Sequence, residues 1–175
     1  ADEVASALAS ACAQRGESGQ QVEIIRNGSR GLFWLEPLVE VATPQGRIAY
    51  GPVTVADVPG LLDAGLLHGG AHALCHGPVD AIPYLARQER LTFTRMGVTD
   101  PLSLADYEAH GGWAGLRRAQ SMDGAAVVDE VLQSGLRGRG GAAFPAGIKW
   151  KTVRAAGGPQ KYVVCNADEG DSGTY

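Results

Sequence analysis

The chain has 175 residues, of which 45% are apolar and 19% are charged, so it can bury one core or two small ones. Its 15 Lys and Arg residues against 19 Asp and Glu residues give a formal net charge of −4. That balance argues against a nucleic-acid binder or a ligand of anionic membranes, whose affinity comes from counterion release. No apolar run reaches the ~18 residues of a membrane span, and the N-terminus has no leader pattern. We therefore expect a cytoplasmic protein whose partners are small molecules or proteins.

Cysteine and histidine give no clear metal signal. Cys12, Cys75 and Cys165 are odd in number and far apart, which predicts neither a disulfide framework nor a thiolate cluster. We expect Cys165 to be a small core residue. The residues His68, His72, Cys75 and His76 have a spacing that a metal could use, but their tract is rich in glycine and proline, which favours ordinary structural roles.

The first 68 residues predict an α-β-β-β-α order. Apolar residues at helical spacing indicate the first helix, and the turn Thr43-Pro44-Gln45-Gly46 indicates a β-hairpin. Thr54 followed three residues later by Asp57 resembles a capping box and predicts the start of the second helix. The expected elements are a helix over 1–14, a strand over 22–25, hairpin strands over 37–41 and 47–50, and a helix after residue 54.

The rest of the chain predicts a connector and a second domain. Residues 68–101 contain three prolines and little periodicity, so the domain boundary is expected there. Ser103 and Asp123 are N-cap residues of two predicted helices, and a third helix and a buried strand follow. The expected helices run over 103–109, 123–134 and 147–156, and the expected strand over 162–165. We place the domains at 1–80 and 102–175, with a connector over 81–101.

Glycine is the compositional outlier, with 25 residues, and the segment GLRGRGGAAFPAGIKW (135–150) is the densest part. Gly138, Gly140 and Ala143 fit a dinucleotide-binding fingerprint, but a predicted helix rather than a strand precedes them, which weakens that interpretation. Consecutive glycines still allow close backbone approach to a ligand. Residues 131–167 contain no carboxylate, which favours an anion site over a solvated basic surface. The segment has six cations: Arg137, Arg139, Lys149, Lys151, Arg154 and Lys161.

A second candidate site is the segment NADEGDSGT (166–174), directly after the predicted buried strand. In open α/β sheets, ligands bind at the carboxyl ends of strands, so Asn166, Asp168 and Glu169 would face a crevice. Their acceptors suit ribityl or ribose hydroxyls or a ring N–H. An acidic calcium-type loop or an ordinary polar turn remains an alternative interpretation of this segment.

These two motifs together strongly resemble the family of NADH- and FMN-binding subunits shared by respiratory complex I, the diaphorase of NAD-reducing hydrogenases and NAD-dependent formate dehydrogenases. The resemblance runs from about Leu91 to Tyr175. It implies that FMN contacts Gly138, Arg139, Gly140, Gly141, Lys149, Asn166, Asp168 and Glu169. It further implies that Phe144 and Asp171 contribute to the NADH pocket. No side chain is expected to be catalytic, because the flavin carries the hydride chemistry.

The N-terminal part resembles the thioredoxin-like ferredoxin module that often accompanies this subunit, through NGSRGLFWLEPLVEV (27–41) and GRIAYGPVTVADV (46–58). In that module two cysteines four positions apart bind a two-iron cluster. Here those positions hold Ser29 and Phe33, which cannot supply thiolates. The resemblance therefore implies a degenerate ferredoxin fold that lacks its cluster and serves as an adaptor, with no metal ligand in this segment.

The expected architecture is α/β, with a degenerate thioredoxin-like ferredoxin domain followed by the start of an α/β FMN-binding domain. The chain departs from the family pattern at Ala143, where a glycine is common, at Thr152, where some relatives have an aromatic residue, and at Asp171, where glutamate is usual. The combination GGAAFP with NADEGDSGT is most similar to the formate dehydrogenase β subunit. The first residue is Ala1 rather than Met, so we expect a fragment or a part of a longer subunit.

This resemblance implies a flavin-containing diaphorase subunit that moves electrons between NAD(H), FMN and iron–sulfur clusters, in a formate dehydrogenase that converts formate and NAD⁺ to CO₂ and NADH. A four-iron cluster is expected from a part of the subunit beyond Tyr175. The implied partners are a small ferredoxin-like γ subunit and a large α subunit with a molybdenum or tungsten cofactor. The alternatives are the diaphorase of an NAD-reducing hydrogenase, complex I, or a non-catalytic scaffold fragment.

Overall fold

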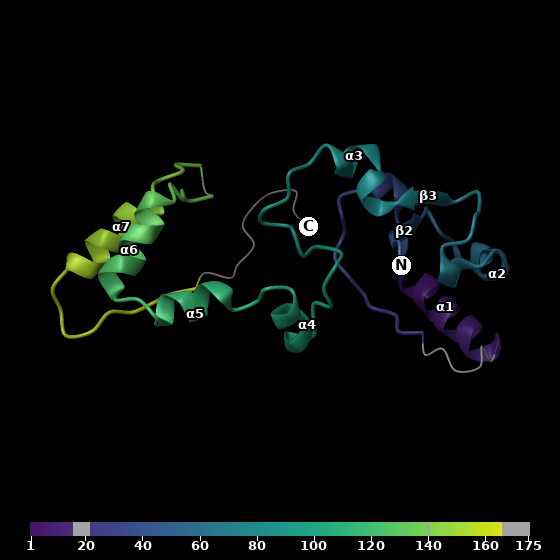
Figure 1. Ribbon diagram of the computed structural model, residues 1–175, viewed down its shortest axis with the longest axis horizontal. Helices are drawn as coiled ribbons and strands as arrows, with labels where there is room; N and C mark the ends of the chain where they lie inside the picture. The colour runs from purple at the N-terminus through teal and green to yellow at the C-terminus, as the bar shows by residue number, and fades with distance from the viewer. Residues whose placement is uncertain (16–21, 140, 166–175) are drawn as a thin grey trace. The chain divides into compact units, whose positions relative to one another are not determined.

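A computed structural model describes residues 1–15, 22–139 and 141–165. The chain divides into two compact units, Ala1–Gly112 and Trp113–Tyr175, which we call the N-terminal unit and the C-terminal unit (Figure 1). The division falls after Gly112. Residues 81–101, which we expected to connect two domains, therefore lie within the N-terminal unit.

In its described residues, the N-terminal unit combines four α-helices with a small antiparallel sheet, and its first helix and its hairpin confirm the sequence prediction. The helices are α1 (Asp2–Arg15), α2 (Val58–Asp63), α3 (Pro83–Ala86) and α4 (Leu104–Ala109). The strands are β1 (Val39–Thr43), β2 (Gly46–Tyr50) and β3 (Cys75–Pro78). Short 3₁₀ turns lie at 33–35, 55–57, 66–68 and 79–81.

The sheet has the order β1-β2-β3, with both pairs antiparallel. Thr43 pairs with Gly46, so Pro44 and Gln45 form the two-residue turn of the hairpin. The third strand was predicted at 22–25, and that prediction is wrong, because Val22–Ile25 forms no strand and its apolar side chains are exposed. The third strand is β3, which pairs with β2 and lies in the glycine- and proline-rich tract where no strand was predicted.

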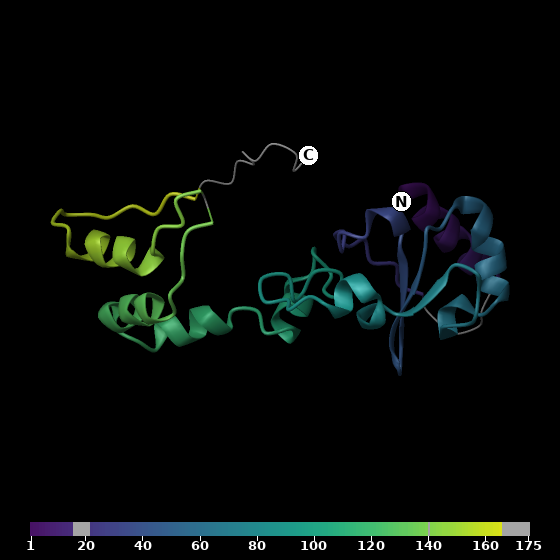
Figure 2. The same ribbon diagram turned by 90° about the horizontal axis from the view of Figure 1, so that it is seen from above.

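The core of the N-terminal unit lies on both faces of this sheet. Neighbouring residues of β2 point to opposite faces, and both Ala49 and Tyr50 are fully buried. Tyr50 packs with apolar residues of α1 and α2, whereas Ala49 packs with those of the 33–35 turn and the region of α3. Figure 2 shows the strands running between α3 on one side and α1 and α2 on the other. Apolar residues therefore cover both faces of the sheet.

The predicted capping box at the start of α2 is confirmed. The Thr54 backbone N–H donates a hydrogen bond to the Asp57 carboxylate at 2.8 Å, and the Thr54 hydroxyl donates to the same oxygen at 2.6 Å. These hydrogen bonds from Thr54 lower the pKa of the Asp57 carboxyl. The helix that follows buries Val58, Leu61 and Leu62, as their spacing predicted.

A polar network joins residues 97–99 to the rest of the N-terminal unit, and this network explains why the expected connector belongs there. The Arg30 guanidinium is 6% exposed and donates to both carboxylate oxygens of Glu40, which is 13% exposed. The carbonyls of residues 97, 98 and 99 each accept a hydrogen bond from a different side chain. The donors are Arg30 at 3.2 Å, Arg47 at 3.0 Å and Asn27 at 2.6 Å. We call this set the Arg30 network.

The C-terminal unit contains the helices α5 (Ala114–Gln120), α6 (Gly124–Gln133) and α7 (Ala146–Ala155). The Asp123 carboxylate caps α6 by accepting hydrogen bonds from the backbone N–H groups of Ala125 and Ala126, at 2.7 and 3.1 Å. Ser103 caps α4 in the N-terminal unit in the same manner, through the Asp106 N–H. Both caps confirm the predicted helix starts.

The buried strand predicted over 162–165 is wrong. Residues Tyr162–Cys165 form no strand, and Val163 is 99% exposed. A strand needs a neighbour to accept and donate its backbone hydrogen bonds, and the described part of the C-terminal unit has only the isolated bridge between Arg137 and Pro145. Cys165 is likewise exposed and is not the core residue that we expected. No helix among the described residues has the length and apolar character needed to cross a membrane.

Candidate functional site

The glycine-rich segment is a loop that joins two closely packed helices. Figure 1 shows α6 and α7 side by side, and the loop connects the end of α6 to the start of α7. Gly147, in the first turn of α7, makes this approach possible, because a Cβ atom there would lie 2.4 Å from Leu132 Cα of α6. The packing role of Gly147 was missed from the sequence. A glycine inside a predicted helix is the signal that could have indicated it.

The loop closes upon itself before α7 begins. The Gly138 N–H donates to the Phe144 carbonyl at 2.8 Å, and the Ala146 N–H donates to the Leu136 carbonyl at 2.9 Å. These hydrogen bonds flank the bridge between residues 137 and 145. These hydrogen bonds therefore hold the base of the loop at a fixed width, and Arg139 and Gly141–Ala143 lie toward its tip.

Ala143 adopts the left-handed backbone conformation, with φ of 44°. This region favours glycine, because a Cβ atom is sterically crowded there. The Arg137 guanidinium donates to the Ala143 carbonyl at 3.1 Å and fixes this turn. The conformation gives a physical reason for the glycine expected at this position, and the alanine carries strain that the loop closure holds in place.

Two glycines of the loop leave space beside the backbone. A Cβ atom on Gly141 would meet no atom within 4 Å, and a Cβ atom on Gly138 would make only ordinary contact, at 3.7 Å from the Phe144 carbonyl oxygen. A flat or phosphorylated ligand can approach a backbone of this kind to contact distance. Gly140 lies outside the described residues.

The start of α7 is electropositive. Pro145 is the N-cap residue, no side chain caps the helix, and the first turn has no acidic residue. Lys149 lies in the same helix, with its ammonium nitrogen 5.5 Å from the centroid of the Phe144 ring. The positive end of the helix dipole and the Lys149 ammonium together favour the binding of an anion.

The cations are not neutralised within this segment. Lys161 Nζ donates to the Arg154 carbonyl at 3.2 Å, next to the C-terminal end of α7. Arg118 of α5 pairs with Glu130 of α6, upstream of the loop. The described residues from 131 to 165 therefore contain cations and no carboxylate, which favours an anionic ligand.

The structure brings together only part of the predicted site. Gly138, Gly141, Phe144 and Lys149 lie on one loop and the helix that follows it, and Arg139 lies at the loop tip. The other predicted ligand-binding residues lie outside the described residues. They are Gly140, Asn166, Asp168, Glu169 and Asp171.

In the N-terminal unit, the two positions expected for cluster ligands do not fit an iron–sulfur cluster. The Ser29 hydroxyl donates to the Glu36 carboxylate and accepts from the Gly31 N–H at 2.9 Å. Phe33 is 74% exposed. Cys12 and Cys75 are half-buried against the apolar cluster of α1 and α2. These residues do not form the set of thiolates that holds a two-iron cluster.

The histidine-rich tract is used structurally. His76 Nε2 lies 2.7 Å from the Gly51 carbonyl oxygen, and His72 Nδ1 accepts from the Leu74 N–H at 3.2 Å. The thiol sulfur of Cys75 accepts from the Gly77 N–H at 3.4 Å. Within the described ranges, no three His, Cys, Asp or Glu side chains converge as a metal-binding group.

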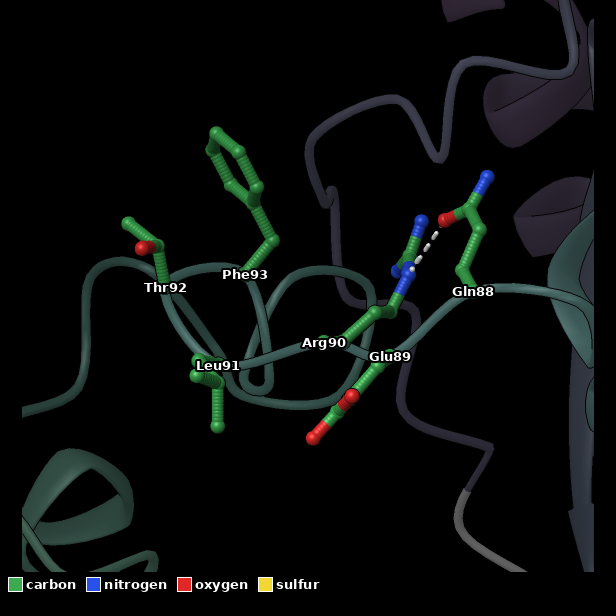
Figure 3. Close-up of a pocket in the computed structure, with 6 residues that line it drawn as sticks. All are labelled: Gln88, Glu89, Arg90, Leu91, Thr92 and Phe93. Carbon is green, nitrogen blue, oxygen red and sulfur yellow. Dashed lines mark hydrogen bonds between the residues drawn. The ribbon is translucent and has the colours of Figure 1, made fainter.

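A surface hollow in the N-terminal unit is formed by Gln88–Phe93 (Figure 3). Arg90 Nε donates to the Gln88 side chain at 3.0 Å, and Arg90 Nη2 donates to the Arg30 carbonyl at 3.3 Å. Figure 3 shows Leu91 and Phe93 directed to different sides of the loop. The hollow shares no residue with the glycine-rich loop and contains no group suited to flavin chemistry.

Part of the C-terminal unit is similar to a known protein family. Residues 131–175 match the family described as the Nuo51 FMN-binding domain. This match starts within α6 and includes the whole glycine-rich loop. The resemblance to the shared family of NADH- and FMN-binding subunits is therefore confirmed for this part of the chain.

Three relatives with curated names are similar to the chain. It is 52% identical over 85 residues to the NADP-reducing hydrogenase subunit HndC of Solidesulfovibrio fructosivorans, covering 49% of this chain and 17% of that protein. It is 46% identical over 88 residues to an NADH-quinone oxidoreductase subunit of Rhizobium meliloti, covering 50% and 21%. It is 55% identical over 49 residues to the NAD-reducing hydrogenase HoxS subunit alpha of Cupriavidus necator, covering 28% and 8%. The aligned part thus spans about a fifth or less of each relative.

The described residues fit FMN. An open glycine backbone suits a planar ring system, and the cations around an uncapped helix start suit its phosphate. FMN carries no positive charge, so the absence of carboxylates from 131 to 165 is consistent with it. The loop closure holds these groups in place before any ligand binds, which reduces the ordering cost of binding.

Proposed function

We propose that the loop over 137–145 and helix α7 form one wall of an FMN site in a subunit that exchanges electrons with NAD(H). The observation that carries this proposal is the closed loop, whose Gly141 has open space where a side chain would be, beside a helix start rich in cations. The family match over the same residues supports it.

The chain's own residues bind and orient. The backbone at Gly138 and Gly141 lets the ligand approach, and Lys149 and Arg139 attract phosphate or the negative charge of a reduced flavin. Phe144 contributes to the nicotinamide nucleotide pocket. The chemistry that FMN supplies when bound is hydride exchange with NAD(H) and release of single electrons.

We propose further that residues 166–171 complete the site. Asn166, Asp168 and Glu169 would bind the hydroxyls or ring N–H of the flavin, and Asp171 would lie beside the nucleotide. A carboxylate near a diphosphate repels it, so Asp171 would speed nucleotide release. Asp171→Asn in the full-length subunit is expected to tighten NADH binding at low salt, which a titration at two ionic strengths measures.

The complex in which the subunit works is a finer proposal. The segment GGAAFP together with NADEGDSGT favours a formate dehydrogenase. That complex would include a γ subunit and an α subunit carrying molybdenum or tungsten, and the four-iron cluster would lie in the subunit to which this chain belongs. The printed names of the similar relatives favour a hydrogenase or a quinone oxidoreductase. Metal analysis of the purified complex separates these: molybdenum or tungsten supports formate, and nickel supports hydrogen.

For the N-terminal unit we propose an adaptor role in a degenerate thioredoxin-like ferredoxin fold. Its core is complete on both sheet faces, while its expected cluster positions hold Ser29 and Phe33. Anaerobic reconstitution of the full-length subunit with Ser29→Ala should leave its iron content unchanged. Loss of two iron atoms per subunit in that variant would show that the site binds a cluster after all.

The direct test of the proposed function is anaerobic reduction of the purified full-length subunit by NADH. Bleaching of one equivalent of bound flavin is the expected result. A subunit that binds no FMN after reconstitution, while its circular dichroism shows folded protein, would contradict the proposal.

A further inference from the structure

Phe144 and Lys149 form a pair that the sequence motifs do not reveal. The Lys149 ammonium lies 5.5 Å from the Phe144 ring centroid, within the range of a cation–π interaction. In the described part of the chain, no carboxylate pairs with Lys149 and its ammonium donates no hydrogen bond. The ammonium is therefore held near the ring while its N–H groups stay available.

The two side chains have rigid attachments. The Phe144 carbonyl accepts the hydrogen bond from Gly138 that closes the loop, and Lys149 lies in α7, which Gly147 packs against α6. Phe144 is 45% exposed, so its ring is not fixed by a core. The backbone closure fixes the point from which the ring extends, and the ring lies 5.5 Å from the Lys149 ammonium.

A second cation–π pair in the N-terminal unit shows the contrast. The Arg95 guanidinium lies 4.9 Å from the centroid of the Tyr107 ring, but Arg95 Nε also donates to the His110 carbonyl at 2.9 Å. Arg95 is thereby committed to holding α4. Among the described residues, the Lys149 ammonium donates no hydrogen bond of this kind. It is therefore available to bind a ligand.

We propose that Phe144 is a positioning residue for Lys149: its ring holds the ammonium beside the open backbone of the glycine loop, ready for an anionic ligand. This inference rests on the proposed FMN site. It adds to the role proposed above for Phe144 in the nicotinamide nucleotide pocket, because here the ring acts on FMN binding through Lys149. A free lysine side chain loses rotamer entropy on binding an anion, and a ring that already restricts it reduces that loss.

A double-mutant cycle in the flavin-depleted full-length subunit tests this, with FMN affinity measured by fluorescence quenching. Phe144→Leu removes the ring but keeps an apolar side chain, and we expect it to weaken FMN binding about 2- to 5-fold, the size of an exposed cation–π interaction. Phe144→Trp keeps an aromatic face and should restore the affinity. In a Lys149→Met background, Phe144→Leu should have no further effect.

The outcomes separate the alternatives. If Phe144→Leu weakens FMN binding equally in both backgrounds, the ring contacts the ligand itself and the positioning role is wrong. An unchanged affinity in Phe144→Leu would also overturn it. If the unsubstituted subunit binds no FMN, the proposed function fails instead. Carbon-13 NMR of Lys149 gives an independent measurement, because loss of the ring should shift its side-chain resonance before any ligand is added.

Discussion

The two units differ in where their apolar side chains lie. Both units expose large apolar side chains, but among the described residues every buried apolar side chain except Val128 belongs to the N-terminal unit. The N-terminal unit also has the buried Arg30–Glu40 pair. The C-terminal unit instead has the glycine loop, the cations and the family match. Stability is thus concentrated in one unit and ligand chemistry in the other.

This contrast teaches that the most informative sequence motif need not mark the best-packed structure. A loop that must admit a ligand leaves space beside its backbone, as at Gly141. Segments with few buried contacts are also those that open most readily. Each unit should therefore depend on the interactions that distinguish it.

Removing Arg30 should damage the N-terminal unit most. Arg30→Met leaves the largely buried Glu40 carboxylate without its partner and removes the hydrogen bond to the Gly97 carbonyl. A buried ion pair broken in this manner costs on the order of 3–5 kcal/mol. Hydrogen exchange of amides in β1–β3 measures the loss, and exchange in α6 and α7 should not change.

Arg15→Met is the matched control, because the Arg15–Asp63 pair is much more exposed. Its cost should stay below about 1 kcal/mol. Equal costs for the two arginines would show that burial of the Arg30 pair contributes nothing, and the contrast between the units would lose its strongest support.

Gly147→Ala should break the packing of the C-terminal unit. The added Cβ atom would lie 2.4 Å from Leu132 Cα, so α6 and α7 must separate, at a cost of about 1–3 kcal/mol. The matched control is Gly115→Ala in α5, where a Cβ atom meets nothing within 4 Å, and which should stabilise its helix by about 0.5–1 kcal/mol. Circular dichroism melting curves distinguish the two. Similar melting of both variants would mean that α6 and α7 do not need close contact.

Tyr50→Phe should cost about 1 kcal/mol, because the buried Tyr50 hydroxyl donates to the Gly70 carbonyl at 2.7 Å. Burial, with a smaller contribution from the Cys75 thiol, raises the pKa of Tyr50 to about 12. A raised folded-state pKa favours the protonated side chain, so its stabilisation is complete below pH ~10, the unfolded value, and is lost as pH rises toward 12. Denaturant titrations at pH 8 and 11 should show this slope for the natural chain only. Tyr84→Phe, at an exposed tyrosine, should alter neither.

Asp123→Ala should give the smallest effect, which is a loss of helix at the start of α6. Hydrogen bonds from the N–H groups of Ala126 and Ala125 lower the pKa of the Asp123 carboxyl. Its stabilisation is therefore present above the unfolded value of ~3.9 and is lost as pH falls through the lower folded-state pKa. Asp123→Asn keeps a capping oxygen and should remove the pH dependence. NMR shifts of the α6 amides between pH 7 and 2.5 report this, and an unchanged profile in Asp123→Asn would show that Asp123 does not control it.

Local chemistry made part of the fold predictable from the sequence. The Thr54–Asp57 capping box, the Asp123 cap and the turn at Pro44 each depend on residues within four positions, and the structure has all three. The glycine loop was likewise identified from composition and charge. Its resemblance to NADH- and FMN-binding subunits was identified from motif order, and the comparison confirmed that resemblance over residues 131–175.

Long-range partners made the rest unpredictable. Strand β3 pairs with β2 across the whole of α2, and its sequence CHGP has no strand character. The segments 22–25 and 162–165 have strand composition but no neighbouring strand in the described structure. The Arg30–Glu40 pair and the Gly147–Leu132 contact also depend on what lies opposite, which no local pattern shows.

The central claim is that the glycine loop receives FMN, and Gly141→Val tests it most directly. The structure has no atom within 4 Å of a Cβ at this position, so the substitution should leave the fold intact while the branched side chain occupies the space of the ligand. Gly157→Val, also at an open position but after α7, is the matched control. The measurement is the amount of flavin released from each purified full-length variant. Gly141→Val should be folded and lack FMN, whereas Gly157→Val should retain it. A folded Gly141→Val protein with a full complement of FMN would contradict the account.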